Sequence, residues 1–544
     1  MMSGSYLVLF AAGAVSYHVY FRNRENHLRI VLYLQIFATT LIAEVLFFQH
    51  RYGLNFTAAF TQAGRIQGSM LGGYYTSILI YRVFFHPLNT FPSPFGCRIT
   101  SLFLPVIFRH SDAFRQVQRL HDQYGPFVRL RPNYLSIAHP KAVNVIYGPG
   151  SRCTKADWYD ISYPMVSLQT MRDKKAHEER RRVWSAAFGD KAVRGYEERL
   201  RRYLNDLVNY FSSQATAGKP VNITKWFELY SYDFMGDLTF GKSFGMLEAQ
   251  EDYWAIHLLK QAMIPLGLYL PTWFFRVVTS IPGLSRAWQR LFDFCGERMM
   301  ERIKTPAEIP DIASVLVAPI KGQQPSRGQW ELLRGDAQLV ILAGSDTTAT
   351  ILAAAMYQLV QHPEQLQRLR DEVSPYITDP SHEVLHEKIA NLPHLNAIIN
   401  ETLRLHPPAA ASLQRKTPPE GITIEGVYIP GNMTVMCPQY VLAHDEEVYE
   451  RSKEFYPERW YLHPEMVKQR AAFAPFSLGP YGCIGKPLAL LTLRNTLVRL
   501  VTMFDFEFAP GEDGTAFEGK AKDRFTMGYG DLQILFRKRR DIGS

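Results

Sequence analysis

The residue best suited to chemistry is a lone cysteine, Cys483, in a glycine-rich turn near the C-terminus. It lies in the segment 476–485 (FSLGPYGCIG), directly before a stretch predicted to be helical from Leu488 onward. Glycines let backbone N–H groups approach the sulfur, and the N-terminus of a helix adds positive potential, so both lower the thiol pKa. The pattern predicts a thiolate that binds a metal, rather than a buried structural cysteine.

A second reactive pair lies in the middle of a long helix predicted from about residue 328 to 361. The stretch contains no proline and ends at His362-Pro363. At ~1.5 Å per residue, such a helix is about 50 Å long. Asp346 and Thr347 interrupt its apolar residues with an acid and a hydroxyl. A membrane-spanning helix is the alternative, but a polar interruption at mid-membrane is costly, which favours a core helix.

Glutamate and arginine at i,i+3 share one helix face and can pair, as Glu401 and Arg404 would. That spacing also occurs elsewhere, for example at Glu178 and Arg181, so its meaning depends on its setting, NETLRLHPP (residues 400–408). A further arginine, Arg459, lies in the segment YPERW (residues 456–460).

These segments together resemble the cytochrome P-450 family. Residues 476–485 are similar to its haem-binding loop, residues 401–404 to its ExxR pair and residues 456–460 to its PERF segment. The resemblance covers the chain from about residue 85 to the C-terminus and is closest to membrane-bound filamentous-fungal members. One departure is Tyr481, which stands where most members have an arginine or histidine that pairs with a haem propionate.

The resemblance implies a role for each motif residue. Cys483 is the expected axial ligand of haem b (iron protoporphyrin IX), and Asp346 and Thr347 are the expected catalytic proton relay. The other residues expected to contact haem are Phe476, Gly485, His177, Arg181 and Arg415. Glu401, Arg404 and Arg459 are expected to form a structural triad, and the substrate pocket is expected at Ala343, Ala411, Ser412, Phe525 and Thr526.

The implied activity is that of a haem-thiolate monooxygenase, because a thiolate ligand favours O–O cleavage. It would use O2 to oxidise a lipophilic small molecule, in secondary metabolite biosynthesis. The chain has no GxGxxG fingerprint, so electrons are expected from NADPH through a separate reductase. The implied fold is mainly α (α+β), with a hairpin at 127–130 and 134–138 and further strands at 422–429 and 532–536.

Two other functions are consistent with parts of the sequence. His382-Glu383-Val-Leu-His386 is a literal HExxH, which on a helix would bind zinc, with Glu401 as a conceivable third ligand. However, Ser381 is expected to cap a short surface helix with few apolar neighbours, a poor setting for a zinc hydrolase. A haem-thiolate isomerase or dehydratase is the second alternative, and the Asp346–Thr347 pair argues against it.

Three apolar stretches at about 5–21, 30–48 and 70–86 predict a membrane anchor of one to three spans within residues 1–88, followed by a catalytic domain at 89–544. Arginines after the first and third stretches predict a cytosolic catalytic domain by the positive-inside rule, and the family implies the endoplasmic reticulum. Asn55 begins a glycosylation sequon in the loop expected on the opposite side.

The overall composition limits the other classes of function. The chain has 544 residues, 47% hydrophobic and 20% charged, with a formal charge of +9. This composition argues against disorder, and no nucleic-acid-binding motif accompanies the basic run at 174–182. The five cysteines are scattered and form no CxxC, so neither a disulfide framework nor a structural zinc site is predicted.

Overall fold

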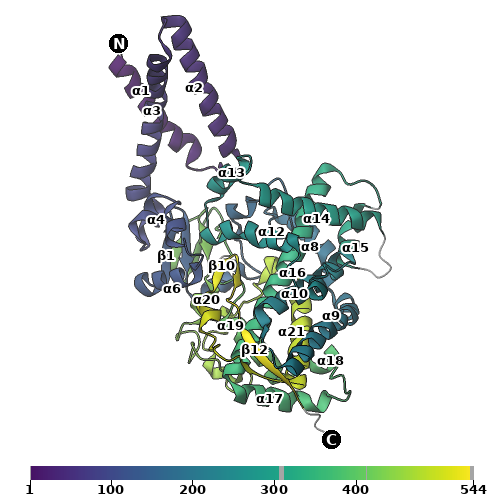
Figure 1. The fold of residues 1–544 in the computed structure, drawn as a ribbon. Coiled ribbons are helices and arrows are strands. Elements are labelled where there is room, and N and C mark those ends of the chain that lie inside the picture. Colours follow the sequence, from purple (N-terminus) through teal and green to yellow (C-terminus); the bar gives the residue numbers. More distant parts are fainter. Residues whose placement is uncertain (1, 306–310, 321, 412, 540–544) are drawn as a thin grey trace.

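The computed structural model describes residues 2–305, 311–320, 322–411 and 413–539. A large, mainly helical body carries three helices that project from one side of it (Figure 1). These anchor helices are α1 (Met2–Ser16), α2 (Ile30–Tyr52) and α3 (Phe56–Ile80). A π-helical turn, Tyr81–Phe85, continues α3 and ends at His86, whose extended backbone precedes Pro87.

Two segments of the anchor are long and apolar enough to cross a membrane: Gly4–Phe21 and His27–Tyr52. The third predicted stretch, 70–86, forms the C-terminal part of α3 and the turn after it. Within the described residues α3 does not reach the same hydropathy, since it carries polar side chains such as Gln62 and Arg65. It nevertheless returns the chain from the far end of α2 to the body (Figure 1).

The anchor helices α1 and α3 cross at glycines. A Cβ atom on Gly73 would lie 1.8 Å from the carbonyl oxygen of Phe10, and one on Gly13 would lie 2.0 Å from that of Met70. Small residues at such crossings let two backbones approach closely, which is a common way for helices to associate in membranes.

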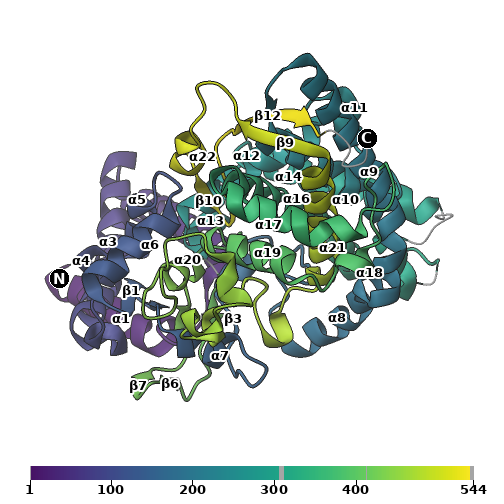
Figure 2. The same ribbon diagram turned by 90° about the horizontal axis from the view of Figure 1, so that it is seen from below.

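The body is built around α16 (Arg327–Gln361), which matches the long helix predicted from the sequence. It packs against α10 and α14 on one side and against α19 and α21 on another (Figure 2). About two thirds of its most apolar window (67%) is buried inside the protein, which confirms the prediction of a core helix. The helices of eight or more residues in the body are α6 (Ala113–Tyr124), α7 (Pro140–Tyr147), α8 (Lys174–Phe188), α9 (Asp190–Ala217), α10 (Ile223–Phe240), α12 (Trp254–Met263), α13 (Thr272–Ser280), α14 (Arg286–Lys304), α16, α17 (Pro363–Val373), α19 (Pro393–Leu405) and α21 (Lys486–Met503). The shorter α-helices are α4 (Phe95–Ile99), α5 (Phe103–Ile107), α11 (Met246–Ala249), α15 (Ile312–Val317), α18 (His386–Ile389), α20 (Gln439–Ala443) and α22 (Thr515–Gly519).

Small sheets flank the helices. The largest has the order β1-β2-β8-β5-β3, in which the antiparallel β1–β2 pair is the predicted hairpin and β2 runs parallel to β8. Its strands are β1 (Phe127–Arg131), β2 (Tyr134–Ile137), β3 (Thr154–Lys155), β5 (Arg415–Lys416) and β8 (Thr434–Met436). The other sheets comprise β4 (Val221–Asn222) with β9 (Phe504–Phe508) and β12 (Gln533–Lys538), β6 (Ile422–Ile424) with β7 (Val427–Ile429), and β10 (Lys522–Arg524) with β11 (Thr526–Gly528).

One local prediction is wrong. No helix follows Ser381, because His382 adopts a left-handed backbone conformation (φ 57°) and the chain stays irregular until α18 begins at His386. The two histidines of the HExxH pattern therefore do not share a helix face. Glu383 lies within 3.3 Å of the guanidinium of Arg201 as an ion pair. The zinc-hydrolase alternative receives no support from this geometry.

Candidate active site

The cysteine turn is positioned by close backbone contacts directly before α21. The backbone N–H of Cys483 donates to the carbonyl of Phe476 over 2.7 Å. Gly479 has a positive φ of 60°, and a Cβ atom there would lie 2.7 Å from two carbonyl oxygens, so only glycine fits. Cys483 is accessible from the cavity, but its depth within the protein raises the pKa of its thiol, whereas the N–H groups of Gly485 and Lys486 that point at the sulfur act in the opposite direction.

Cys483 faces a cavity of about 300 Å³ in the centre of the body. Its walls come from α8, α10, α16, the cysteine turn and the start of β11, and most of them are apolar. The sequence-predicted residues that line this cavity are His177, Arg181, Ala343, Thr347, Arg415, Phe476, Cys483, Gly485, Phe525 and Thr526. Segments separated by up to about 350 residues in the chain therefore meet at one site.

One predicted pocket residue does not line the cavity, and another lies outside the described residues. Ala411 is buried in a separate apolar cluster with Tyr134 and Met436, so its assignment to the cavity wall is wrong. Ala409 and Leu413, two positions to either side, face the cavity instead. Ser412 lies outside the described residues.

The acid and hydroxyl of α16 point in different directions. Thr347 lines the cavity, and its hydroxyl donates to the carbonyl of Ala343 over 2.7 Å. Asp346 instead accepts a hydrogen bond from the hydroxyl of Tyr232, a buried side chain on α10. Burial raises the pKa of Asp346 to about 7, against the opposite effect of the Tyr232 hydrogen bond. The carboxyl can therefore take up and release a proton near neutral pH.

Four basic side chains form one wall of the cavity, which we call the basic wall: Lys155, His177, Arg181 and Arg415. Burial first, and then the neighbouring cations, lower the pKa of His177 to about 3 and that of Lys155 well below its usual value. Arg181 donates to the carbonyl of Gly482 over 2.7 Å, which ties this wall to the cysteine turn.

Among the described residues, no carboxylate forms an ion pair with the basic wall. The Nδ1 atom of His177 and the Nε atom of Arg415 are buried without a hydrogen-bond partner there. Buried cations and orphaned donors are costly unless an anion joins them. The wall therefore fits an anionic ligand with acceptor oxygens.

Tyr481, the departure from the family pattern, lies at the centre of the basic wall. Its ring centroid is 4.7 Å from that of His177, 4.9 Å from the Lys155 ammonium and 5.0 Å from the Arg415 guanidinium. The Tyr481 hydroxyl is buried and has no hydrogen-bond partner in the described chain. A phenol here keeps a donor at the wall without adding another buried charge.

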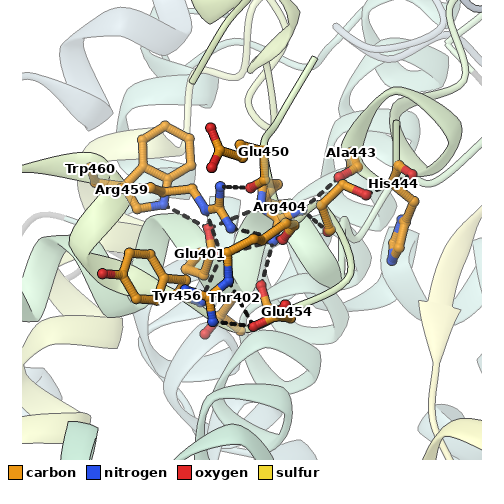
Figure 3. A network of polar contacts seen from close by, with 12 residues as sticks. Glu401, Thr402, Arg404, Ala443, His444, Glu450, Glu454, Tyr456, Arg459 and Trp460 are labelled. Atoms are coloured by element: carbon orange, nitrogen blue, oxygen red, sulfur yellow. Dashed lines mark hydrogen bonds and ion pairs between the residues drawn. The ribbon is translucent and has the colours of Figure 1, made fainter. Parts of the chain in front are cut away.

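The predicted glutamate–arginine triad is assembled between α19 and the turn Pro457–Trp460 (Figure 3). Glu401 accepts from Arg404 over 2.8 and 2.9 Å and from Arg459 over 2.9 Å, and all three side chains are fully buried. It also accepts from the indole of Trp460 over 2.9 Å. Burial alone would raise the pKa of Glu401, but the two guanidinium groups outweigh it and lower the pKa.

Aromatic packing links the triad to the segment that leads to the cysteine turn. The ring of Trp460 lies 4.4 Å from that of Phe473, which begins the segment leading to the turn. The remaining donors of Arg404 and Arg459 bind backbone carbonyls at Ala443 and in 450–454. This network holds the irregular segment 443–473 against α19.

The residues around the cavity fit the haem that the family resemblance implies. The cysteine sulfur would provide a thiolate ligand, and the basic wall would offer hydrogen-bond donors to two carboxylates. The apolar cavity between them suits a flat macrocycle.

The contributors that the sequence analysis missed include Lys155, Tyr159, Tyr232 and Trp460. Lys155 lies in a two-residue strand, and Tyr159, whose hydroxyl accepts from Arg415 over 3.0 Å, lies in a single 3-10 turn. Neither element carries a periodic pattern. Only Trp460 had a signal, because it is part of the segment that resembles PERF.

Comparisons with known proteins identify a family model and several similar enzymes. Residues 94–535 match the family model of cytochrome P450. The chain is 44% identical to cytochrome P450 monooxygenase notG' of Aspergillus versicolor, over 99% of this chain and 98% of that protein. It is 43% identical to tryprostatin B 6-hydroxylase of Aspergillus fumigatus, over 99% and 97%. Cytochrome P450 monooxygenase lcsK of Purpureocillium lilacinum is 39% identical over 86% of each chain.

Proposed function

This chain belongs to the cytochrome P450 family and is a monooxygenase, and on that premise we propose that Cys483 is the axial ligand of haem b in the central cavity. The observation that carries the proposal is that the cysteine sulfur shares its cavity with a basic wall, which forms no ion pair with a carboxylate among the described residues. When bound, haem with a thiolate ligand supplies the activation of O2. The haem alternatives without oxygen chemistry, an isomerase or a dehydratase, are not favoured by the names of the relatives.

The protein's own residues hold the cofactor and shape its surroundings. Lys155, His177, Arg181 and Arg415 would bind the two propionates, with the hydroxyl of Tyr481 as an additional donor in place of the usual arginine or histidine. Phe476 and Gly485 would help to hold the haem at the cysteine turn. The triad of Glu401, Arg404 and Arg459 acts by supporting the turn, without touching the reacting atoms.

Protons reach the cavity through α16. Thr347 lines the cavity, and Asp346, next to it in the chain, has a pKa of about 7 and can exchange a proton near neutral pH. Because the Asp346 carboxyl is bound by Tyr232, it must change its side-chain rotamer, or pass its proton through water, to serve Thr347. The apolar walls limit the entry of bulk water.

The substrate is a lipophilic small molecule of secondary metabolism. Apolar side chains dominate the cavity wall, with Ala343, Phe525 and Thr526 as candidate substrate contacts. Tryprostatin B, named for a relative that covers the whole chain, is the first compound to test. Electrons come from NADPH through a separate reductase.

The catalytic body lies on the cytosolic face of the endoplasmic reticulum. The two apolar helical segments of the anchor favour membrane insertion. If α2 crosses the membrane, α3 must return the chain, since its end joins the body. This arrangement supports three spans within 1–88, with Asn55 on the luminal side as a glycan acceptor.

The test is the absorption spectrum of the reduced, CO-bound protein in membranes. The wild type should show a Soret band shifted to long wavelength, which Cys483→Ala should lose because the thiolate is removed. Cys295→Ala, a buried cysteine on α14, is the matched control and should keep the shifted band. An unshifted band in the wild type would mean a neutral ligand and would refute the assignment.

A further inference from the structure

The short loop between α1 and α2 is bound to the catalytic body by an acidic side chain and a histidine. Glu25 accepts from Lys416 over 2.7 Å and from Arg172 over 2.8 Å. His27, which is buried, lies 2.8 Å from the carboxylate of Asp160. Asp160 and Arg172 are themselves paired, so the two anchor residues and three body residues form one network.

The body side chains of this network are less exposed than those of ordinary surface pairs, whereas Glu25 is 35% exposed. The side chains of Asp160, Arg172 and Lys416 are 16%, 21% and 27% exposed. Burial would raise the pKa of Glu25, but Lys416 and Arg172 outweigh it and lower the pKa. The acids and the histidine lie close enough to bind a metal ion, yet the two cations already satisfy the carboxylates.

The same network continues into the wall of the active-site cavity. Besides its two acids, Arg172 donates through Nε to the backbone carbonyl of Lys155 over 3.2 Å. Asp160 directly follows Tyr159, and Lys416 directly follows Arg415. Each body residue of the network is therefore adjacent to, or bonded to, a residue at the basic wall.

A second contact joins the anchor to the body nearby. The helix α13 packs against α2 and against the turn His27–Arg29 that begins it (Figure 1). Together these contacts fix the direction in which α2 leaves the body.

We propose that Glu25 and His27 form a docking surface that seats the membrane anchor on the catalytic body and holds residues 154–172 in place at the basic wall. The partner is an acidic and basic patch of the same chain: Asp160, Arg172 and Lys416. The position of the anchor and the retention of the haem are then coupled. This coupling rests on the proposed haem site, whereas the docking does not.

The docking part is tested by trypsin cleavage of the full-length chain in lipid vesicles with the body outside. The loop offers cleavage sites at Arg22, Arg24 and Arg29. The double variant Glu25→Gln/His27→Ala should be cleaved after Arg22 or Arg29 about tenfold faster, the change expected when the two ion pairs of Glu25 and the His27–Asp160 contact are lost. Lys141→Met, which removes an exposed ion pair with Glu425 elsewhere on the body, should leave the rate unchanged.

The coupling part is tested by the rate of haem loss to an excess of a haem-scavenging globin. The double variant should lose haem several-fold faster than wild type and Lys141→Met, while its initial CO-bound spectrum shows that it is folded. Unchanged cleavage of the loop would overturn the docking surface. Faster cleavage with unchanged haem loss would overturn the coupling. A wild type without haem would refute the proposed function, and the cleavage result would still stand.

Discussion

Replacing Glu401 by glutamine should destabilise the protein strongly, because two buried arginines would lose their counter-charge. Glu401 accepts five hydrogen bonds, two from Arg404 and one each from Arg459, Trp460 and the backbone of Tyr456. In the variant an amide NH2 would face guanidinium donors. Removing one partner of a buried ion pair costs about 3–5 kcal/mol, a large part of the roughly 5–15 kcal/mol that stabilises a typical protein.

The assay is guanidinium unfolding of the detergent-solubilised protein, followed by tryptophan fluorescence. Glu507→Gln is the control, since Glu507 pairs with Arg537 at the surface, where both side chains are more than half exposed. Such a pair contributes less than about 1 kcal/mol, so its unfolding midpoint should barely move. If Glu401→Gln shifted the midpoint no more than Glu507→Gln does, the triad would not be the support of the cysteine turn.

Three further predictions concern pH, the anchor and the basic wall. Burial raises the pKa of Asp346 to about 7, so folding favours the protonated carboxyl. The contribution of Asp346 to the free energy of unfolding is therefore full below about pH 4 and is lost as the pH rises to about 7. Asp346→Asn should abolish that loss, of at most about 4 kcal/mol, in unfolding measured across this range. Gly73→Ala should separate α1 from α3 and lower the unfolding temperature in detergent, whereas Gly68→Ala, where a Cβ atom meets open space, should not. Lys155→Met should stabilise the haem-free protein, because it removes a buried amine, and should also speed haem loss from the haem-bound protein. A variant that stabilises the haem-free protein without speeding haem loss would contradict the role of the basic wall.

The sequence by itself determined the family, the mainly helical fold and the local elements. The cysteine turn, the Glu401–Arg404 pair and the long α16 helix were all predictable, because glycine spacing, i,i+3 pairing and helical periodicity act over a few residues. The β1–β2 hairpin was predictable for the same reason. The prediction of a helix that begins after Ser381 was wrong, because His382 adopts a left-handed backbone conformation that no local sequence pattern signals.

Only the tertiary structure decided which distant residues meet. Lys155 joins the basic wall from a two-residue strand, Tyr232 reaches Asp346 from 114 positions away, and Ala411 turns into a separate cluster. The pairing of His27 with Asp160 spans 133 positions. These contacts depend on how packed helices place their side chains in three dimensions, which residue spacing along the chain does not encode.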